Sequence, residues 1–321
     1  MIVTVTPNPS VDRTLEVEAL VRGEVLRTTA HRQDPGGKGI NVSRALTANG
    51  HATTAVLPVG GPEGAQLLAL LADTGVPVVT VPIAEAVRAN ITIAEPDGTV
   101  TKLNEPGPEL SVTELRALLD ATAQAAAGAR WLVISGSLPP GAPRSLLSDL
   151  VQHGRAAGAR VAVDTSGEAL TCTLAAHPDL IKPNAEELAE ATGRPLATLG
   201  DAIEAAHVLR AQGAGAVLAS LGPDGAVYVD GEVAVHARAA VDHPRSTVGA
   251  GDASLAGFLT ASDLPLEGLR TAVAYGAAAV SLPGSQMPGP EDLDLDAVEV
   301  DARPQRDRPL SGALQPAVSH R

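Results

Sequence analysis

Short runs of consecutive apolar residues alternate along this chain with longer stretches in which alanine and leucine recur at helical spacing. Uninterrupted apolar runs of this kind are typical of strands that are covered on both faces. The runs lie at residues 2–6, 55–59, 131–135, 160–164, 180–182 and 216–220. The helical stretches lie at residues 39–49, 64–74, 112–127, 145–157, 185–192, 199–212 and 255–261. This alternation predicts an α/β fold in which a central, mostly parallel sheet is flanked by helices.

Two segments, residues 14–34 and 86–106, break the alternation. In the second, polar and apolar side chains alternate on both sides of Asp97-Gly98, a pattern that favours a β-hairpin. We therefore expect a small antiparallel sheet outside the main one. Inserted strands of this kind often form a lid over a site, although an edge extension without a role in binding is an open alternative.

The composition narrows the class of protein. The chain has 321 residues, and its 23 Lys and Arg against 37 Asp and Glu give a formal net charge of −14. Such a charge argues against nucleic acid as a partner, because phosphate backbones bind basic surfaces. One Trp, two Tyr and one Phe are too few for a base-stacking platform, and a single cysteine excludes an intrachain disulfide.

No apolar run reaches the roughly 18 residues that a membrane-spanning helix needs, so we expect a cytoplasmic protein with no membrane contact. Residues 1–300 carry the strand and helix patterns and are predicted to form one domain. The remaining residues, 301–321, contain several prolines and arginines without apolar periodicity. This composition predicts a disordered tail.

A glycine-rich segment, residues 35–41, precedes the first predicted helix. Glycines such as Gly37 allow the backbone to approach a ligand closely, and a helix N-terminus favours an anion. The segment is not a Walker-type loop, because Lys38 is followed by Gly39 rather than by serine or threonine. A ligand-binding loop and a plain strand–helix turn are both compatible with it.

A second loop, residues 246–254, combines several features at the start of a predicted helix. Gly249, Ala250 and Gly251 leave their backbone amides free to point at one spot, where the helix dipole favours developing negative charge. Asp252 places a carboxylate there, and this carboxylate could take a proton from a hydroxyl group. The alternative is that Asp252 only caps the helix. Because a cap does not require the preceding Gly-Ala-Gly, we expect a catalytic base beside an anion hole.

Other candidates are weaker singly. Asp12 follows the first strand, at the sheet edge where open α/β folds bind ligands. Asn184 and Glu187, three residues apart at a helix start, could hold a hydrated Mg²⁺ through its waters. Helix or turn capping is the alternative for all three. Arg88 and Asn90 lie in the expected lid, where an arginine is commonly only solvated.

Taken in order along the chain, several segments resemble the ribokinase/PfkB family of sugar kinases, most closely its branch that acts on sugar phosphates. The resemblance runs from Thr4 to about Pro283. It is carried by Asn-Pro-Ser-Val-Asp at 8–12, Gly-Gly-Lys-Gly-Ile-Asn at 36–41, Ile-Ser-Gly-Ser-Leu-Pro at 134–139, Lys-Pro-Asn-Ala-Glu-Glu at 182–187, Ser-Leu-Gly at 220–222 and Ser-Thr-Val-Gly-Ala-Gly-Asp at 246–252. The resemblance implies a ribokinase-like kinase domain with a small β-sheet lid and ATP-dependent phosphorylation of a sugar hydroxyl.

The resemblance also implies a role for each matching position. Asp252 would be the base, and the amides of Gly249, Ala250 and Gly251 would form the anion hole. ATP and Mg²⁺ would be bound by Lys182, Asn184, Glu187, Ser220, Gly222, Gly225 and Thr247, with Asn184 and Glu187 reaching the metal through water. The sugar hydroxyls would contact Asp12, Gly37 and Asn41, and the phosphate that the substrate already carries would contact Lys38, Arg88, Asn90 and Ser137.

The expected partner is a phosphorylated ketohexose, and two positions bear on which one. Lys38 is similar to the pattern of family members that act on fructose 1-phosphate or tagatose 6-phosphate, whereas Glu24 stands where members that act on fructose 6-phosphate are expected to carry a lysine. We therefore expect D-fructose 1-phosphate as acceptor and fructose 1,6-bisphosphate as product. Tagatose 6-phosphate stays open, and so does fructose 6-phosphate, because residues 76–78 and 163–170 are at least as similar to its kinases.

Two other classes of function are weighed against a kinase. A non-catalytic sugar-phosphate sensor would not need Asp252, and a dinucleotide-dependent oxidoreductase would need Gly-x-Gly-x-x-Gly after the first strand, where the chain has Pro-Asn-Pro. The proline-rich stretch after Ser281 departs from the family where members close the adenine pocket and often a K⁺ site. The resemblance also leaves open a homodimer formed through the lid.

Overall fold

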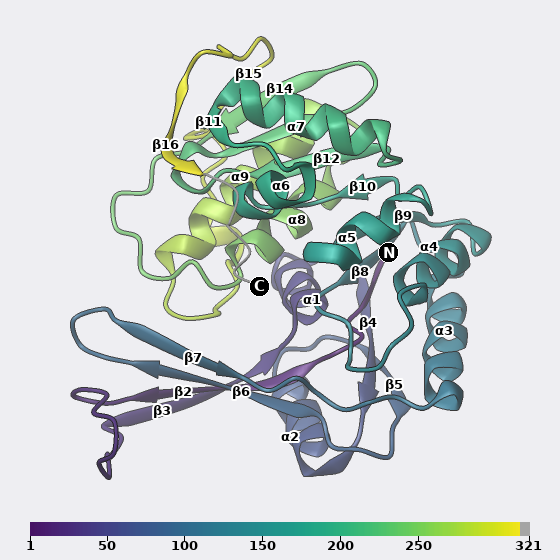
Figure 1. Cartoon of the computed structure of the whole chain (residues 1–321), viewed down its shortest axis with the longest axis vertical. Coiled ribbons are helices and arrows are strands. Elements are labelled where there is room, and N and C mark those ends of the chain that lie inside the picture. The colour runs from purple at the N-terminus through teal and green to yellow at the C-terminus, as the bar shows by residue number, and fades with distance from the viewer. Residues whose placement is uncertain (315–321) are drawn as a thin grey trace.

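The computed structural model describes the backbone of residues 1–314 and the side chains of residues 1–311. Its main element is a sheet of ten strands (Figure 1). The strands are β1 (Ile2–Val5), β4 (Thr53–Val59), β5 (Val78–Pro82), β8 (Trp131–Ser135), β9 (Arg160–Asp164), β10 (Leu180–Ile181), β12 (Ala216–Ser220), β13 (Ala226–Val229), β14 (Ala234–Arg238) and β15 (Glu299–Asp301). They are ordered β15-β14-β13-β12-β10-β9-β8-β1-β4-β5. In the part of this order that runs from β12 to β5, every pair of adjacent strands is parallel, which confirms the predicted sheet. Strands β13, β14 and β15 pair antiparallel and extend the sheet at the β12 side.

Helices cover both faces of this sheet (Figure 1). They are α1 (Lys38–Ala48), α2 (Gly61–Ala72), α3 (Val112–Ala126), α4 (Leu146–Ala156), α5 (Gly167–Leu174), α6 (Ala185–Thr192), α7 (Leu199–Ala211), α8 (Ala250–Thr260) and α9 (Pro265–Ser281). In β8, Leu132 and Ile134 belong to the core formed with α3 to α7, whereas Trp131 and Val133 belong to the core formed with α1, α8 and α9. This two-sided burial explains why β8 is apolar at consecutive positions. Within the described residues, no helix has the length and apolar character needed to cross a bilayer.

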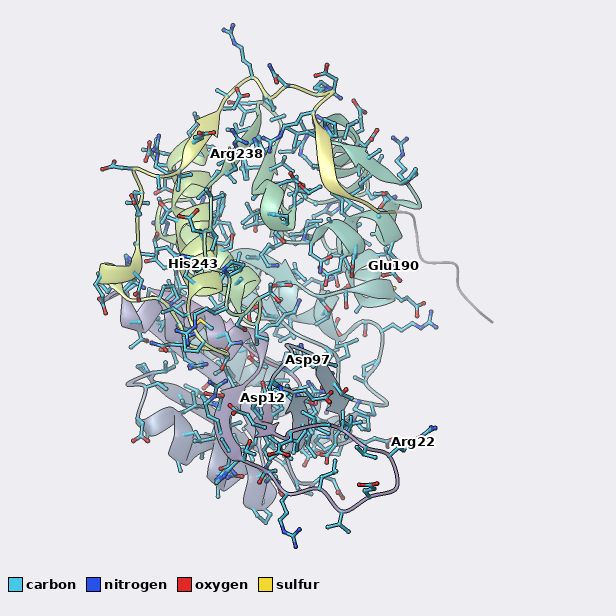
Figure 2. The ribbon with its side chains drawn as sticks, turned by 90° about the vertical axis from the view of Figure 1, so that its left-hand side faces the viewer. Asp12, Arg22, Asp97, Glu190, Arg238 and His243 are labelled. Atoms are coloured by element: carbon cyan, nitrogen blue, oxygen red, sulfur yellow. The ribbon has the colours of Figure 1, made fainter. Side chains whose placement is uncertain are left out.

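A second, four-stranded sheet projects from the main body (Figure 1). It contains β3 (Ala30–Gly36), β2 (Ser10–Glu16), β6 (Arg88–Ala94) and β7 (Val100–Asn104), in that order. Strands β6 and β7 form the predicted hairpin, and Gly98 supplies its positive φ of 91°. The prediction of an antiparallel sheet is wrong for the central pair, because β2 and β6 come from separate excursions out of the main body and run parallel. Figure 2 views the molecule from the side on which this lid sheet projects, with Asp12 and Asp97 labelled.

The C-terminal part of the chain also differs from expectation. Strand β15 joins the edge of the main sheet, and β16 (Pro309–Leu314) pairs antiparallel with β11 (Leu196–Thr198). The prediction of a disordered tail is therefore wrong for residues 301–314, while residues 315–321 lie outside the described part. Backbone hydrogen bonds, polar side-chain contacts and the buried Leu310 hold this stretch, and it has no periodic apolar face, which is why its composition did not indicate order.

Candidate active site

Four charged side chains meet at the carboxyl ends of the parallel strands. Asp164 is the last residue of β9, Lys182 follows β10 directly, Lys38 begins α1, and Asp252 lies in the first turn of α8. The carboxyl ends of parallel strands share one edge of a sheet, so residues that are distant in sequence are brought together there. Three of these residues were predicted from the sequence, and Asp164 was missed.

Asp164 is fully buried, at 0% exposure, between two lysines. Its Oδ1 lies 2.6 Å from Lys38 Nζ and its Oδ2 lies 3.1 Å from Lys182 Nζ. Burial opposes the charged form of this carboxyl group, but the attraction of Lys182 and Lys38 outweighs burial and holds the pKa of Asp164 below its usual value. Burial likewise opposes the charged form of Lys38, yet Asp164 and Glu187 raise the pKa of Lys38 overall. Asp164 and Lys38 are therefore ionised at neutral pH.

Asp252 is the candidate base. It is the third residue of α8, whose N-cap is Gly249, so the capping alternative for Asp252 is wrong. Its Oδ2 accepts a hydrogen bond of 2.9 Å from Asn41 Nδ2 on α1, and the residue is only 7% exposed. Burial, followed by the negative charge of Asp164, raises the pKa of Asp252 to about 7. A carboxyl group with a pKa near neutrality is well matched to proton transfer.

The N-terminus of α8 forms a cradle next to this carboxylate. The first amides of a helix have no carbonyl partner within the helix, so they are available to an anion. A Cβ atom placed on Gly251 would lie 3.2 Å from Lys182 Nζ, which shows that the ammonium group adjoins these amides. Developing negative charge at this point would contact both the amides and a lysine.

Gly249 has a φ of 78°, and a Cβ atom there would lie 2.6 Å from Met287 Cε. We predict that Gly249→Ala distorts the cradle and lowers kcat by about tenfold or more, because left-handed backbone costs an L-residue about 1–2 kcal/mol and Met287 must also move. The matched control is Gly50→Ala, with a φ of 73° and nothing within 4 Å of its Cβ position. Steady-state kinetics of both variants measure the effect on kcat. Equal kcat values for Gly249→Ala and Gly50→Ala would contradict the prediction.

Asn184 and Glu187 form a reciprocal cap at the start of α6. The Glu187 amide donates to Asn184 Oδ1 at 2.8 Å, and the Asn184 amide donates to Glu187 Oε2 at 2.9 Å. The capping interpretation is thus confirmed for these two atoms. The other carboxylate oxygen, Glu187 Oε1, lies 3.8 Å from Lys38 Nζ and so faces the charged cluster.

The cluster offers few oxygen donors for Mg²⁺, the metal that the resemblance implies. Among the described residues, no group of three or more His, Cys, Asp or Glu side chains is placed to enclose a metal ion. Mg²⁺ commonly keeps several waters and takes only one or two carboxylates. Glu187 Oε1 fits such a hydrated ion, whereas both oxygens of the buried Asp164 carboxylate are already paired with lysines.

A hydrogen-bonded cluster lies at the base of the lid sheet. Asp12 Oδ1 accepts hydrogen bonds from Ser10 Oγ at 2.7 Å and from Asn90 Nδ2 at 2.9 Å, since the parallel register places Asp12 beside Asn90. A Cβ atom on Gly36 would lie 2.3 Å from Asp12 Oδ1, so only glycine permits this approach. Within the described structure, Asn90 Oδ1 is buried without a hydrogen-bond partner. Such an atom is consistent with a polar ligand that binds here.

Arg88 and Ser137, both predicted to bind a phosphate, contact the same residue. Arg88 Nη2 donates to the Asn8 carbonyl at 3.2 Å, and Asn8 Nδ2 donates to Ser137 Oγ at 3.3 Å. Arg88 Nε and Asn8 Oδ1 are further buried atoms without a partner among the described side chains. Lys38 is not part of this group, because its ammonium group lies at Asp164.

Arg44 is a cation that the sequence interpretation missed. Its Nη1 donates to Asn41 Oδ1 at 3.0 Å, so Arg44 orients the amide that in turn contacts Asp252. Burial lowers the pKa of Arg44, and the negative charge of Asp34 on the lid opposes that effect. The spacing of three residues from Asn41 places both on one face of α1, which is the signal that could have identified Arg44.

Three of the predicted nucleotide residues, Ser220, Gly222 and Gly225, lie at a short 3₁₀ turn, η1 (Gly222–Asp224). Gly222 and Gly225 have positive φ values of 60° and 88°, and a Cβ on Gly225 would lie 2.0 Å from the Ala237 carbonyl oxygen. Ser220 forms an isolated parallel bridge with Asn184, so the turn lies next to the start of α6.

Two predicted positions lie on exposed loops. Thr247 precedes α8, and its carbonyl accepts a hydrogen bond from the Ala250 amide at 3.4 Å. Glu24 lies between β2 and β3, and within the described structure its side chain forms no hydrogen bond or ion pair. The structure therefore does not bring Glu24 to the charged cluster.

Comparisons with known proteins agree with this architecture. The family of pfkB carbohydrate kinases matches residues 6–292. The chain is 41% identical to a 1-phosphofructokinase of Rhodobacter capsulatus, over 91% of this chain and 94% of the relative. It is 39% identical to the ATP-dependent 6-phosphofructokinase isozyme 2 of Escherichia coli K12, over 91% of this chain and 96% of that relative.

A solved structure has the same fold. Phosphofructokinase-2 from Escherichia coli in complex with substrates and products superposes with a TM-score of 0.85 at 37% identity, covering 91% of this chain and 96% of that one. The resemblance carried by the glycine-rich loops is thereby confirmed over most of the chain. The protein belongs to the pfkB family of carbohydrate kinases.

Proposed function

We propose that this kinase transfers the γ-phosphoryl group of ATP to a free hydroxyl of a ketohexose phosphate, with D-fructose 1-phosphate as acceptor and fructose 1,6-bisphosphate as product. The observation that carries the proposal is the buried carboxyl group of Asp252, with its pKa near 7, at a helix N-terminus beside Lys182. Relatives named 1-phosphofructokinase and 6-phosphofructokinase support a kinase of the phosphofructokinase type.

In this proposal Asp252 takes the proton of the acceptor hydroxyl as that oxygen bonds to the γ-phosphorus. The bond between the γ-phosphorus and the bridging oxygen breaks, and ADP leaves with the electron pair. The amides at the start of α8 and the ammonium group of Lys182 stabilise the negative charge on the transferring group. Phosphoryl transfer depends mainly on positioning and on charge stabilisation of this kind.

Mg²⁺ would be held through its waters by Glu187, whose Oε1 faces the cluster, while Asn184, the other predicted residue, uses its Oδ1 in the helix cap. When bound, it would supply positive charge to the phosphates of ATP. The chain's own contribution is the arrangement of its lysines: Lys38 and Lys182 keep Asp164 ionised, and Lys182 also faces the anion cradle.

The acceptor would bind between the lid sheet and α1. Asp12 and Asn41 would hold sugar hydroxyls, and the unpartnered atoms of Asn90 and Arg88 would contact polar groups of the substrate. We assign the acceptor's own phosphate to Arg88, Asn90 and Ser137. Lys38 was expected to join them, but its ammonium group is paired with Asp164, so we leave it out of this site. Arg44, which contacts Asn41, is a further cation on the acceptor side.

A coupled assay of ADP release with Mg-ATP tests this choice of acceptor. We expect kcat/KM for fructose 1-phosphate to exceed that for fructose 6-phosphate and tagatose 6-phosphate by about tenfold, which corresponds to about 1.4 kcal/mol. Preference for a 6-phosphate would overturn the assignment based on Lys38 and Glu24 and leave the kinase chemistry intact. No turnover of these sugars would favour the sugar-phosphate sensor.

The pH dependence of the rate tests the base. Because Asp252 must be unprotonated to accept a proton, we predict that kcat/KM rises with pH and levels off above about 7. The acceptor phosphate titrates near pH 6, by analogy with other phosphate esters, so the residual activity of Asp252→Asn serves as the control. The rise of kcat/KM near pH 7 should be absent from that variant. A rise at the same pH in both proteins would contradict the assignment of Asp252 as the base.

A further inference from the structure

The chain continues beyond the family match, which ends at residue 292, with a segment that we call the C-terminal strap, residues 299–311. The strap leaves the main sheet at β15 and crosses to β16 (Figure 1). Near its far end, the amides of Leu199 and Gly200 at the start of α7 donate to the carbonyls of Arg308 at 2.9 Å and Arg306 at 2.7 Å. The strap is therefore fixed to ordered elements at both ends.

The strap contacts the turn η1 through Asp224, a residue that is only 6% exposed. Asp224 Oδ2 accepts a hydrogen bond of 2.6 Å from the Ser311 amide, and Oδ1 accepts one of 3.0 Å from Ser311 Oγ. Arg308 Nη2 lies 3.6 Å from Oδ1. Two residues of the strap thus hold this carboxylate.

The turn is held from its other side by β14. His236 Nε2 lies 2.7 Å from the Asp224 carbonyl oxygen, and since a carbonyl only accepts, Nε2 carries the proton. Burial lowers the pKa of His236, so the ring is neutral near pH 7. The backbone of Asp224 is therefore fixed by β14, and its side chain is fixed by the strap.

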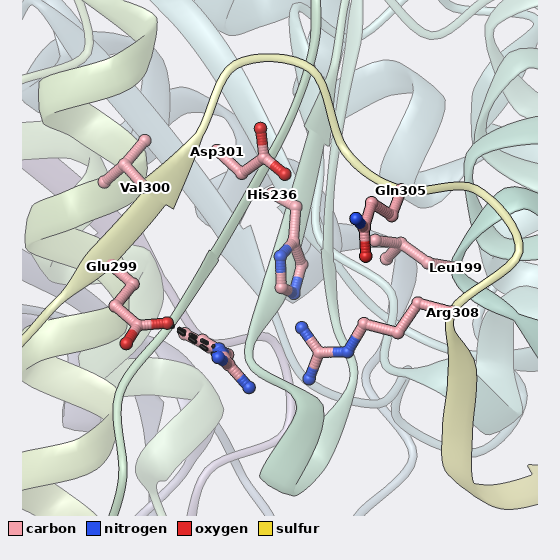
Figure 3. A pocket seen from close by; sticks show the side chains of 8 residues that line it. Leu199, His236, Glu299, Val300, Asp301, Gln305 and Arg308 are labelled. Carbon is pink, nitrogen blue, oxygen red and sulfur yellow. Dashed lines mark hydrogen bonds and ion pairs between the residues drawn. The ribbon is translucent and has the colours of Figure 1, made fainter.

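The strap pairs with β14 through β15, and beyond that pairing a cavity of about 500 Å³ lies between the strap and β14. Gln305 and Arg308 line it from the strap, and His236 and Arg238 line it from β14 (Figure 3). In Figure 3 the side chain of Arg308 extends from the strap toward His236. Side chains do not fill this space, and the strap packs into the core at Leu310, next to Ser311. Loss of the polar contacts at Asp224 would therefore free the carboxylate without removing this apolar anchor.

We infer that the C-terminal strap positions the nucleotide-binding turn, and that Ser311 and Arg308 are positioning residues that act through Asp224. This inference rests on the proposed function, because it takes residues 220–225 to bind ATP. Gly222 and Gly225, at the two ends of the turn, have positive φ values and can adopt other conformations when the turn is released, whereas Pro223 between them is fixed. Release of Asp224 therefore weakens nucleotide binding, whereas the sugar side at Asp12 belongs to another sheet and is unaffected.

The test uses the double variant Arg308→Met/Ser311→Ala in the full chain. Calorimetric titration with Mg²⁺ and a non-hydrolysable ATP analogue should give a Kd about 3- to 10-fold higher than wild type, the effect expected for lost hydrogen bonds. KM for ATP should rise in parallel, while KM for the acceptor stays within about twofold. The conservative variant Arg308→Lys/Ser311→Thr should recover most of the affinity.

The matched control is Arg306→Met, on the same strap, which removes an ion pair with Glu204 on α7 and leaves the turn untouched. The inference is overturned if the folded double variant binds the ATP analogue with the wild-type Kd. It is also overturned if Arg306→Met raises that Kd as much as the double variant does. If the double variant does not fold, the single variant Ser311→Ala takes its place. Its Kd for the ATP analogue is then compared with the wild-type value, and an unchanged Kd overturns the inference. A wild-type protein that binds the analogue but phosphorylates no sugar contradicts the proposed function alone, and the Kd values still test the strap.

Discussion

The variant Asp252→Asn is expected to fold like the wild type and to lose about 10²- to 10⁴-fold in kcat, the usual contribution of a positioned base. An asparagine fills the same volume beside Asn41, at the same buried position in the first turn of α8. It cannot accept the proton of the acceptor hydroxyl. Steady-state kinetics at saturating ATP and acceptor measure the loss.

The matched control for this variant is Asp149→Asn. Asp149 also lies in the first turn of a helix, α4, and its side chain forms no hydrogen bond or ion pair within the described structure. Its kcat should stay within about twofold of wild type. Thermal unfolding of both variants verifies that they are folded. If Asp252→Asn retains kcat within about tenfold, Asp252 is not the base.

The variant Asp164→Asn is expected to lower the free energy of unfolding by about 3–5 kcal/mol, the typical cost of removing one partner from a buried ion pair. Lys182, whose side chain is 5% exposed, would lose its counter-ion, and Lys38 would lose its nearest one. Urea denaturation followed by circular dichroism measures the change.

Two comparisons isolate the effect of burial at Asp164. Asp263 also contacts two cations, Arg130 and Arg160, but its side chain is 70% exposed, so Asp263→Asn should lower the free energy of unfolding far less than Asp164→Asn does. The double variant Asp164→Asn/Lys182→Met should recover part of the lost stability, because it removes an uncompensated charge. Equal losses at Asp164 and Asp263 would contradict this account of the cluster.

The strands of the main sheet could be predicted because burial on both faces leaves a local signal. The boundaries of β8, β9 and β12 agree with their apolar runs. Helix α9 was not predicted, since its central residues are nearly all small and apolar and no polar face marks a helical period. The parallel pairing of β2 with β6 depends on how separate segments meet and has no local signal.

The candidate site shows the same division. Asp252 and the glycines before it form one contiguous motif, so the sequence could indicate both the candidate base and the candidate anion hole. The role of Asp164 depends on Lys38, which is 126 positions away, and only the folded sheet brings the two together. For Asn184 and Glu187 the sequence left capping and metal binding as alternatives. The structure assigns capping to Asn184 Oδ1 and Glu187 Oε2 and leaves Glu187 Oε1 facing the cluster.

The most direct test of the central claim is to follow the purified protein with Mg-ATP and fructose 1-phosphate by ³¹P NMR. The account predicts that the γ-phosphate signal of ATP disappears while a second phosphomonoester signal grows on the sugar, in equal amount with ADP. Asp252→Asn should slow this conversion by about 10²-fold or more. Release of inorganic phosphate without a new sugar phosphate, or no change in either reactant, would contradict it.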